Sequence, residues 1–270
     1  MKIVVLVKEV PDTYGDRKLD LETGLADRAS SERVLDEIGE RALEVALSYA
    51  DANPGTEVQV VSMAAEEAAA TIRKGLAMGA ASALQVVDPA LAGADLGVTA
   101  TVLAAAVRRA GFDLVITGNL STDGSGGVIP AMLAEHLGVP QATALSSVTI
   151  TASEVSGTRA TDAGVAEVTT SLPAVISITE ALPDARFPNF KGIMAAKKKP
   201  FETISLGDLG IDPERADAPR SIMTAIAEHV LDTALGMAMA SPYGRLCPPF
   251  LACLDELPST TPLPTLRTRM

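Results

Sequence analysis

The chain has 270 residues, of which 47% are hydrophobic and 21% charged, so it can bury a substantial core. Its formal net charge of −12 argues against nucleic acid as a partner, because phosphate neutralisation needs clustered lysine and arginine. There is no signal-peptide pattern, no apolar run as long as a membrane span, and no metal-ligand companion for either cysteine. We therefore expect a cytoplasmic protein with neither stable membrane insertion nor a metal site.

Strands and helices are predicted to alternate over the first 140 residues. Apolar, largely β-branched runs predict buried parallel strands, and apolar residues at steps of three and four predict helices. The expected strands cover residues 3–7, 57–62, 83–87 and 113–117, and the expected helices cover residues 34–50, 66–78, 98–110 and 128–137. Short connections between these elements predict an α/β fold with a doubly wound, mostly parallel, Rossmann-like sheet.

The pattern changes after residue 145. Three short, polar-alternating runs within residues 146–171 predict a small antiparallel hairpin extension. A buried strand is expected at residues 174–178, whereas residues 181–200 hold three prolines and are expected to be irregular. We therefore divide the chain into an α/β domain, residues 1–200, and an irregular C-terminal segment, residues 201–270.

A glycine-rich loop, residues 118–127, joins the fourth expected strand to a helix. Parallel sheets bind ligands beyond the carboxyl ends of their strands, and amides at a helix N-terminus attract phosphate. The loop is not a Walker A loop, and it does not follow the first strand as the dinucleotide fingerprint would. Its local sequence suits a phosphate site and a flexible turn about equally, and its place at the sheet edge favours the phosphate site.

Residues 172–200 read LPAVISITEALPDARFPNFKGIMAAKKKP. An apolar, proline-restricted loop beside three lysines suits either a partner-docking surface or an excursion whose apolar groups fold back onto the domain. The stretch resembles the signature of the electron transfer flavoprotein β-subunit family at residues 172–175, 182, 186–188, 193–194 and 196–199. Further segments fit that family in order, at residues 4–12, 35–42, 70–80 and 114–130, so the likeness runs from residue 1 to about residue 210.

The resemblance implies one subunit of a heterodimer, which binds AMP and supports an FAD that the α subunit holds with most of the contacts. Such a chain carries electrons without a reaction of its own. The donors would be flavin dehydrogenases such as acyl-CoA dehydrogenase, as in fatty acid oxidation. The acceptor would be the membrane quinone oxidoreductase of these flavoproteins or a similar protein.

The resemblance also implies which residues make each site. Phosphate would lie against the amides of residues 124–128, and Thr13 and Leu35 would face the flavin. Partner recognition would use the loop at residues 181–199, with Leu182 as the anchor beside Arg186, Phe187, Ile193 and Met194. The AMP site would comprise Leu6, Arg33, Val34, Leu35, Asp36, Met63, Gly118, Asn119, Ser121, Thr122, Asp123, Gly124, Ser125, Gly126, Gly127, Val128 and Ile129.

Some segments depart from the family pattern. Residues 183–185 read Pro-Asp-Ala in place of Asn-Glu-Pro, which changes the loop that would select partners. Arg33-Val34 replaces Asn-Pro, so a guanidinium that favours phosphate replaces an amide. From about residue 229 the tail has no family likeness, and a shifted reading frame or a chimeric end is our hypothesis for it.

Three other functions stay open. A bifurcating relative would hold a second FAD where AMP is expected, and we favour AMP. A stand-alone ATP-binding signalling domain would explain the sheet and the glycine loop but leave residues 182–199 without a purpose. An ATP-cleaving ligase would need a lysine-bearing phosphate loop and paired carboxylates, which the glycine loop lacks.

Overall fold

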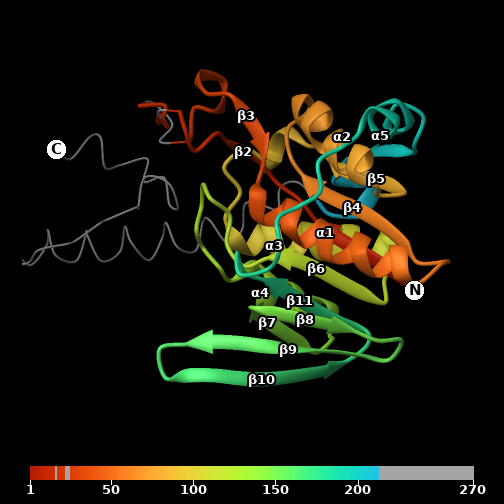
Figure 1. Ribbon diagram of the computed structural model, residues 1–270. Coiled ribbons are helices and arrows are strands. Elements are labelled where there is room, and N and C mark those ends of the chain that lie inside the picture. The colour runs from red at the N-terminus through yellow and green to blue at the C-terminus, as the bar shows by residue number, and fades with distance from the viewer. Residues whose placement is uncertain (16, 22–24, 213–270) are drawn as a thin grey trace, which may run out of the picture.

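A parallel sheet forms the centre of the molecule in the computed structural model, which describes residues 1–212 except 16 and 22–24 (Figure 1). Its strands are β1 (Lys2–Leu6), β4 (Glu57–Met63), β5 (Ser82–Val86), β6 (Leu114–Gly118), β7 (Gln141–Leu145), β11 (Ala174–Ile178) and β12 (Phe201–Ile204). Within the described residues their order is β12-β5-β4-β1-β6-β11-β7, and every neighbouring pair is parallel. This confirms the predicted mostly parallel α/β fold.

Helices cover both faces of this sheet. They are α1 (Glu37–Ala52), α2 (Ala69–Met78), α3 (Leu96–Ala110), α4 (Ile129–Leu137) and α5 (Phe190–Ala196), with one-turn 3₁₀ helices η1 (Arg28–Ser30), η2 (Glu66–Ala68), η3 (Pro89–Leu91) and η4 (Gly207–Leu209). Ile3 and Val5 pack with α1 and α2, while Val4 packs with α3 and α4 on the opposite face. Two buried faces explain why β1 is apolar at successive positions.

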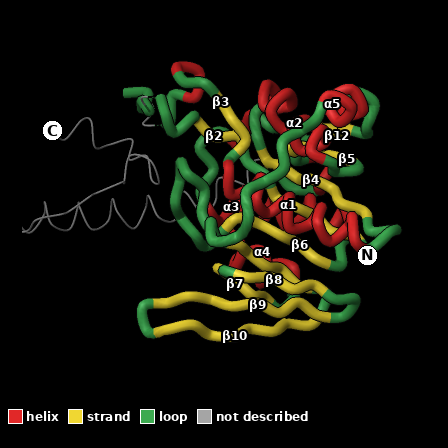
Figure 2. Tube along the Cα trace, in the orientation of Figure 1, coloured by secondary structure: helices red, strands yellow, loops and turns green. Residues whose placement is uncertain are grey.

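Two smaller antiparallel sheets complete the described part of the chain. The predicted extension is present as β8 (Ser147–Ile150), β9 (Glu154–Thr161) and β10 (Gly164–Ser171), and it lies at one end of the molecule (Figure 2). A short pair forms between β2 (Glu9–Pro11) and β3 (Arg33–Leu35). This pair brings the chain back to the end of β1 after an excursion of about twenty residues, residues 12–32.

Several predicted boundaries were wrong. The helix expected from residue 34 begins at Glu37, because residues 33–35 pair with β2 instead of entering the first helical turn. The strands β7 and β12 were missed, and residues 190–196, expected to be irregular, form α5. The tail from about residue 229 lies outside the described residues. None of the described helices combines the length and apolar character needed to cross a membrane.

Candidate functional site

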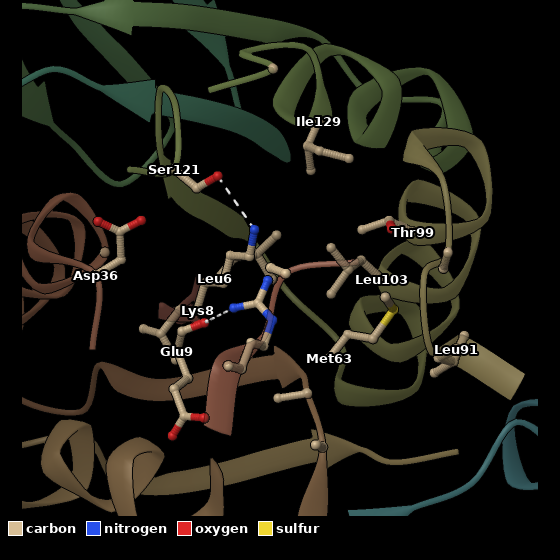
Figure 3. Close-up of a pocket in the computed structure, with 18 of the residues that line it drawn as sticks. Leu6, Lys8, Glu9, Asp36, Met63, Leu91, Thr99, Leu103, Ser121 and Ile129 are labelled. Atoms are coloured by element: carbon tan, nitrogen blue, oxygen red, sulfur yellow. Dashed lines mark hydrogen bonds between the residues drawn. The ribbon is translucent and has the colours of Figure 1, made fainter. Parts of the chain in front are cut away.

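A cleft of about 740 Å³ lies at the carboxyl edge of the central sheet, where the segments after β1, β4, β5 and β6 converge (Figure 3). This is the edge at which the sequence predicts a ligand. The cleft is lined by the end of β1 and the residues after it, by residues in and just before η1, by β3 and the start of α1, by the segments after β4 and β5, by α3, and by the glycine-rich loop and the start of α4. The lining residues are Leu6, Val7, Lys8, Glu9, Leu25, Ala26, Arg28, Arg33, Asp36, Ile38, Gly39, Met63, Ala64, Ala65, Glu66, Glu67, Val87, Asp88, Pro89, Leu91, Ala92, Gly93, Ala94, Thr99, Leu103, Thr117, Gly118, Asn119, Leu120, Ser121, Gly126, Gly127, Ile129 and Pro130.

One end of the cleft is apolar. Figure 3 shows Met63, Leu91, Leu103 and Ile129 around this end, although they come from β4, η3, α3 and α4. Thr99 lies one helical turn before Leu103 and brings a hydroxyl to the same region. An apolar wall with one hydrogen-bonding group suits a flat heterocycle.

Charged side chains of both signs line the rest of the cleft, and the acidic ones are Glu9, Asp36, Glu66, Glu67 and Asp88. Lys8, Arg28 and Arg33 all line it, in a chain whose net charge is negative. Arg33 Nη1 lies 3.5 Å from a carboxylate oxygen of Glu9, which also lines the cleft. Local cations in an acidic protein favour an anionic ligand group in this part of the cleft.

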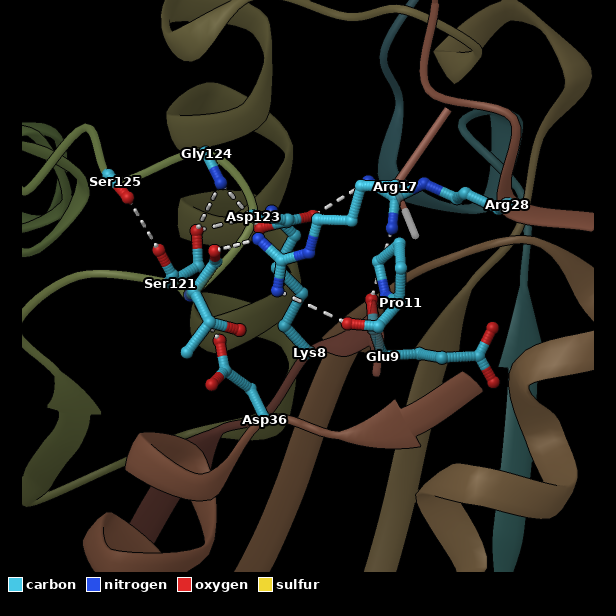
Figure 4. Close-up of polar contacts among 11 residues, drawn as sticks. Lys8, Glu9, Pro11, Arg17, Arg28, Asp36, Ser121, Asp123, Gly124 and Ser125 are labelled. Carbon is cyan, nitrogen blue, oxygen red and sulfur yellow. Dashed lines mark hydrogen bonds and ion pairs between the residues drawn. The ribbon is translucent and has the colours of Figure 1, made fainter. Parts of the chain in front are cut away.

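Asp123 joins two of these cations outside the cleft wall (Figure 4). Its Oδ1 accepts a hydrogen bond from Lys8 Nζ at 2.7 Å, and its Oδ2 accepts one from Arg28 Nη2 at 2.8 Å. Arg17 adds a hydrogen bond to the carbonyl of Thr122. Arg17 and Arg28 thereby fasten the excursion at residues 12–32 to the glycine-rich loop, and Lys8 fastens the segment between β1 and β2 to the same loop.

The protonation of Asp123 reflects this pairing. Burial alone would raise the pKa of its carboxyl. The charge of Lys8 and the hydrogen bonds from Lys8, Arg28 and Ser121 outweigh burial and hold the pKa of Asp123 well below its usual range. The carboxylate is therefore ionised at neutral pH, with only 9% of its side chain exposed.

Asp36 is a buried carboxylate that lines the cleft, with 3% of the residue exposed. Its Oδ2 accepts a hydrogen bond from the Thr122 amide at 3.0 Å, whereas Oδ1 is buried and accepts none among the described residues. Burial raises the pKa of Asp36, the charge of Asp123 raises it further, and the Thr122 hydrogen bond offsets only part of this. Asp36 thus ties the start of α1 to the glycine-rich loop at an electrostatic cost.

The glycine-rich loop follows the cleft closely at two glycines. A Cβ added to Gly118 would lie 2.6 Å from the side chain of Ile38, so β6 can pass the start of α1 only with glycine there. Gly127 has a φ of +66°, in the left-handed region that favours glycine. Two residues later α4 begins, with its N-terminal end at the cleft. Backbone amides and the helix dipole at such an end attract anions.

The structure brings some expected AMP-site residues together and leaves others outside the cleft. Those that line it are Leu6, Arg33, Asp36, Met63, Gly118, Asn119, Ser121, Gly126, Gly127 and Ile129. Those absent from its lining are Val34, Leu35, Thr122, Asp123, Gly124, Ser125 and Val128. Thr13 is exposed, while Leu35 is 2% exposed within the core.

Many lining residues were not among the expected site residues, and Lys8, Arg28, Leu91, Thr99 and Leu103 are the ones that bear on ligand binding. Lys8 directly follows the first predicted strand, and the loop at residues 8–13 is expected at the ligand-binding edge, but the sequence does not single out Lys8 within it. Thr99 and Leu103 lie one turn apart on a predicted helix, but periodicity does not say which helix face meets the cleft. Arg28 reaches the cleft only through the long-range pairing of its excursion, which no local pattern reports.

The expected recognition residues differ in exposure. Leu182 is 9% exposed and packs in the core, while Phe187 is 91% exposed. Ile193 and Met194 are about half exposed, and Phe190, which was not among the expected residues, is 79% exposed. Arg186 forms ion pairs with two acidic residues of α1. The apolar surface of this segment is therefore made by the residues that follow Leu182.

Comparison with known proteins adds independent findings. A family model described as the electron transfer flavoprotein domain matches residues 23–209. The electron transfer flavoprotein subunit beta of Mycobacterium bovis is 44% identical over 230 residues, covering 83% of this chain and 86% of the relative. Its Bacillus subtilis namesake is 32% identical over 218 residues, covering 80% and 84%. Subunit CarD of the caffeyl-CoA reductase-Etf complex of Acetobacterium woodii is 34% identical over 215 residues, covering 79% and 82%.

Proposed function

Because this chain belongs to the electron transfer flavoprotein family, as a β subunit, we propose that it carries electrons as half of a heterodimer and turns over no substrate of its own. In this proposal the cleft binds AMP, and the chain supports an FAD held mainly by the α subunit. The observation that supports the nucleotide assignment is the cleft at the carboxyl edge of the sheet, which is apolar at one end and lined by charged residues elsewhere.

AMP suits both ends of the cleft. Adenine is flat and largely apolar, so it fits against Met63, Leu91 and Leu103, with the Thr99 hydroxyl available to a ring nitrogen or the amino group. The phosphate fits at the N-terminal end of α4. The volume of about 740 Å³ falls within the range of about 300–1,000 Å³ that is usual for small-molecule sites.

FAD in place of AMP is the second candidate, and the number of cations favours it, since Arg28 and Arg33 line the cleft in addition to Lys8. We favour AMP because Asp123 already engages Lys8 and Arg28. A single phosphate can be held by the amides at α4, whereas a diphosphate would need cations that are already paired. An ATP-hydrolysing role has less support, because no lysine-bearing phosphate loop is present in the sequence.

Partner docking is assigned to the exposed face of residues 187–194, formed by Phe187, Phe190, Ile193 and Met194. Burying one such side chain contributes about 1.5–3 kcal/mol, which suits weak, rapidly exchanging contacts with several partners. Leu182 could serve as an anchor only if it left the core. The proposed donors are flavin dehydrogenases such as acyl-CoA dehydrogenase, and the proposed acceptor is a quinone oxidoreductase.

The two residues expected to face the flavin also differ in exposure. Thr13 is exposed just after β2 and can approach a flavin held by the α subunit. Leu35 is the last residue of β3 and its side chain is buried, so its proposed contribution is to hold the backbone of that strand in place. Both roles depend on the geometry of the heterodimer.

The test is the nucleotide content of the purified heterodimer. We expect co-expression with the α subunit from the same source to give a yellow complex that releases one FAD and one AMP on denaturation and does not hydrolyse ATP. Release of two FAD and no AMP would show that the cleft binds FAD, the second candidate. A colourless monomer that hydrolyses ATP would contradict the carrier function.

A pair of matched variants tests the placement of the base. Thr99→Val removes the hydroxyl at the cleft with little change in shape, and Thr101→Val makes the same change at an exposed position on the same helix. Loss of one neutral hydrogen bond should weaken AMP binding about 2- to 10-fold in the first variant. Equal affinities of the two variants would remove Thr99 from the binding site.

A further inference from the structure

We propose that Arg186 is a positioning residue, which with Glu44 and Asp51 fixes the recognition segment (residues 181–199) on α1 so that Phe187 and Phe190 are held ready for a partner. This inference rests on the proposed docking function and deepens it. It changes the role of Arg186 from a group that contacts the partner to one that acts through its neighbours in the chain. The segment crosses α1 on its way to α5 in Figure 1.

The guanidinium of Arg186 is almost fully engaged within the subunit. Its Nε and Nη2 donate to the two carboxylate oxygens of Glu44, each at 2.8 Å, and its Nη1 lies 2.9 Å from Asp51 Oδ2. The backbone amide of Arg186 also donates to Glu44 Oε2, at 3.0 Å. Such bidentate geometry fixes orientation as well as position. Little hydrogen-bonding capacity of Arg186 is left for another protein.

Glu44 is prepared for this role by its surroundings. Ser48, one turn further along α1, donates its hydroxyl to Glu44 Oε1 at 2.9 Å. Burial opposes the charge of Glu44, but the hydrogen bonds from Arg186 and Ser48 outweigh it and lower the pKa of this carboxyl. Glu44 is therefore ionised, and its carboxylate accepts hydrogen bonds from both the backbone amide and the guanidinium of Arg186.

A second ion pair holds the start of the segment. Arg41, one turn before Glu44 on α1, donates to the carbonyl of Leu182 and pairs with Asp184. The side chain of Leu182 is itself buried in the core. The chain from residue 182 to residue 186 thus follows α1, where Arg41 holds residues 182 and 184 and Glu44 holds residue 186.

The far end of the segment is fixed on α2. Gly192 of α5 approaches so closely that a Cβ there would lie 2.4 Å from the carbonyl oxygen of Ala77. Lys199 donates to the carbonyls of Leu76 and Ala80, at 2.9 and 2.7 Å. The apolar side chains of Phe187, Phe190, Ile193 and Met194 project outward from the stretch between Arg186 and Lys199.

This arrangement reduces the entropic cost of docking. A loop that is ordered before binding loses less conformational freedom when a partner covers it. Phe187 follows Arg186 directly, so a backbone fixed at residue 186 limits where its ring can lie. Releasing Arg186 would leave the two phenylalanines present but less well positioned.

The experiment measures electron transfer from a flavin dehydrogenase to the heterodimer, with kcat and KM for the heterodimer determined separately. The variants are Glu44→Gln, Arg186→Lys and Arg186→Ala, and Glu135→Gln on the exposed face of α4 is the matched charge control. We expect about a tenfold rise in KM for Glu44→Gln and Arg186→Ala, with kcat, flavin content and the control unchanged. Arg186→Lys should raise KM less than Arg186→Ala does, because lysine keeps the positive charge but cannot make the bidentate contact.

Two outcomes overturn the proposal. If Arg186→Ala raises KM but Glu44→Gln behaves like the Glu135→Gln control, Arg186 contacts the partner directly. If Phe187→Ala and Phe190→Ala raise KM while no variant of Arg186 or Glu44 does, the segment needs no positioning. Failure of the docking function itself looks different, because the phenylalanine variants would then also leave KM unchanged. If Arg186→Ala does not fold, Glu44→Gln and Arg186→Lys decide between these results.

Discussion

Replacing Asp123 with asparagine should loosen the excursion at residues 12–32 from the glycine-rich loop. The substitution keeps the size of the side chain and removes the charge that attracts Lys8 and Arg28. Both contacts are short, at 2.7 and 2.8 Å, and Asp123 itself is 9% exposed. The lowered pKa of Asp123 indicates that attraction to the cations outweighs the cost of its burial. Removing the charge should therefore destabilise the fold.

The magnitude follows from the exposure of the partners. Lys8 and Arg28 are 43% and 42% exposed, so solvent screens each pair and each contributes about 0.5–1 kcal/mol. Losing both lowers the free energy of unfolding by about 1–2 kcal/mol. For a chain of this size that corresponds to a fall of roughly 2–8 °C in Tm.

Thermal unfolding followed by circular dichroism at low and high salt measures this effect. Asp162→Asn, at an exposed position in the turn between β9 and β10, is the matched control. We expect Asp123→Asn to melt below both the wild type and the control at low salt, with a smaller difference at high salt. If Asp123→Asn and Asp162→Asn melted at the same temperature at low salt, the ion pairs would not hold the excursion.

Three further predictions concern other buried contacts. Asp36→Asn should be neutral or stabilising at pH 7, because a raised pKa means that the ionised form costs stability; a fall in Tm above 5 °C would contradict this. Gly192→Ala should cost about 1–3 kcal/mol and increase proteolysis after Lys197, unlike the roomier Gly207→Ala; equal proteolysis would refute the close approach. The lowered pKa values of Asp123 and Glu44 give stability that is present above about pH 4 and lost as pH falls through the folded values, so acid titration of the wild type should lose more stability than an Asp123→Asn, Glu44→Gln double variant.

The parallel sheet was predictable because its strands are apolar on both faces. Runs such as Ile3–Val5 must be covered from two sides, and apolar residues recur every three to four positions in the helices between them. The strand β7 has the sequence QATAL, in which Gln141 and Thr143 interrupt the apolar run, and β12 begins just after three lysines and a proline. Both are fixed by neighbours already in the sheet. Residues 33–35 fit a helical period, yet pairing with β2 prevails.

The site was predictable in its location more than in its membership. Glycine-rich loops at the carboxyl edge indicate a ligand, and the cleft lies there. Sequence could not report that Asp123 turns towards Lys8 and Arg28, since Arg28 lies 95 residues away along the chain. Nor could it report that Leu182 packs inward while Phe190 faces outward, because both are apolar residues on a proline-rich loop. Such distinctions depend on tertiary contacts.

The carrier function itself is tested most directly by following flavin absorbance in the purified heterodimer. We predict that an acyl-CoA substrate alone leaves the flavin oxidised, and that adding a catalytic amount of acyl-CoA dehydrogenase reduces it. Subsequent addition of a quinone-side acceptor should restore the oxidised spectrum. Reduction of the flavin by substrate alone, or no reduction when the dehydrogenase is present, would contradict the proposal that this chain serves an electron carrier.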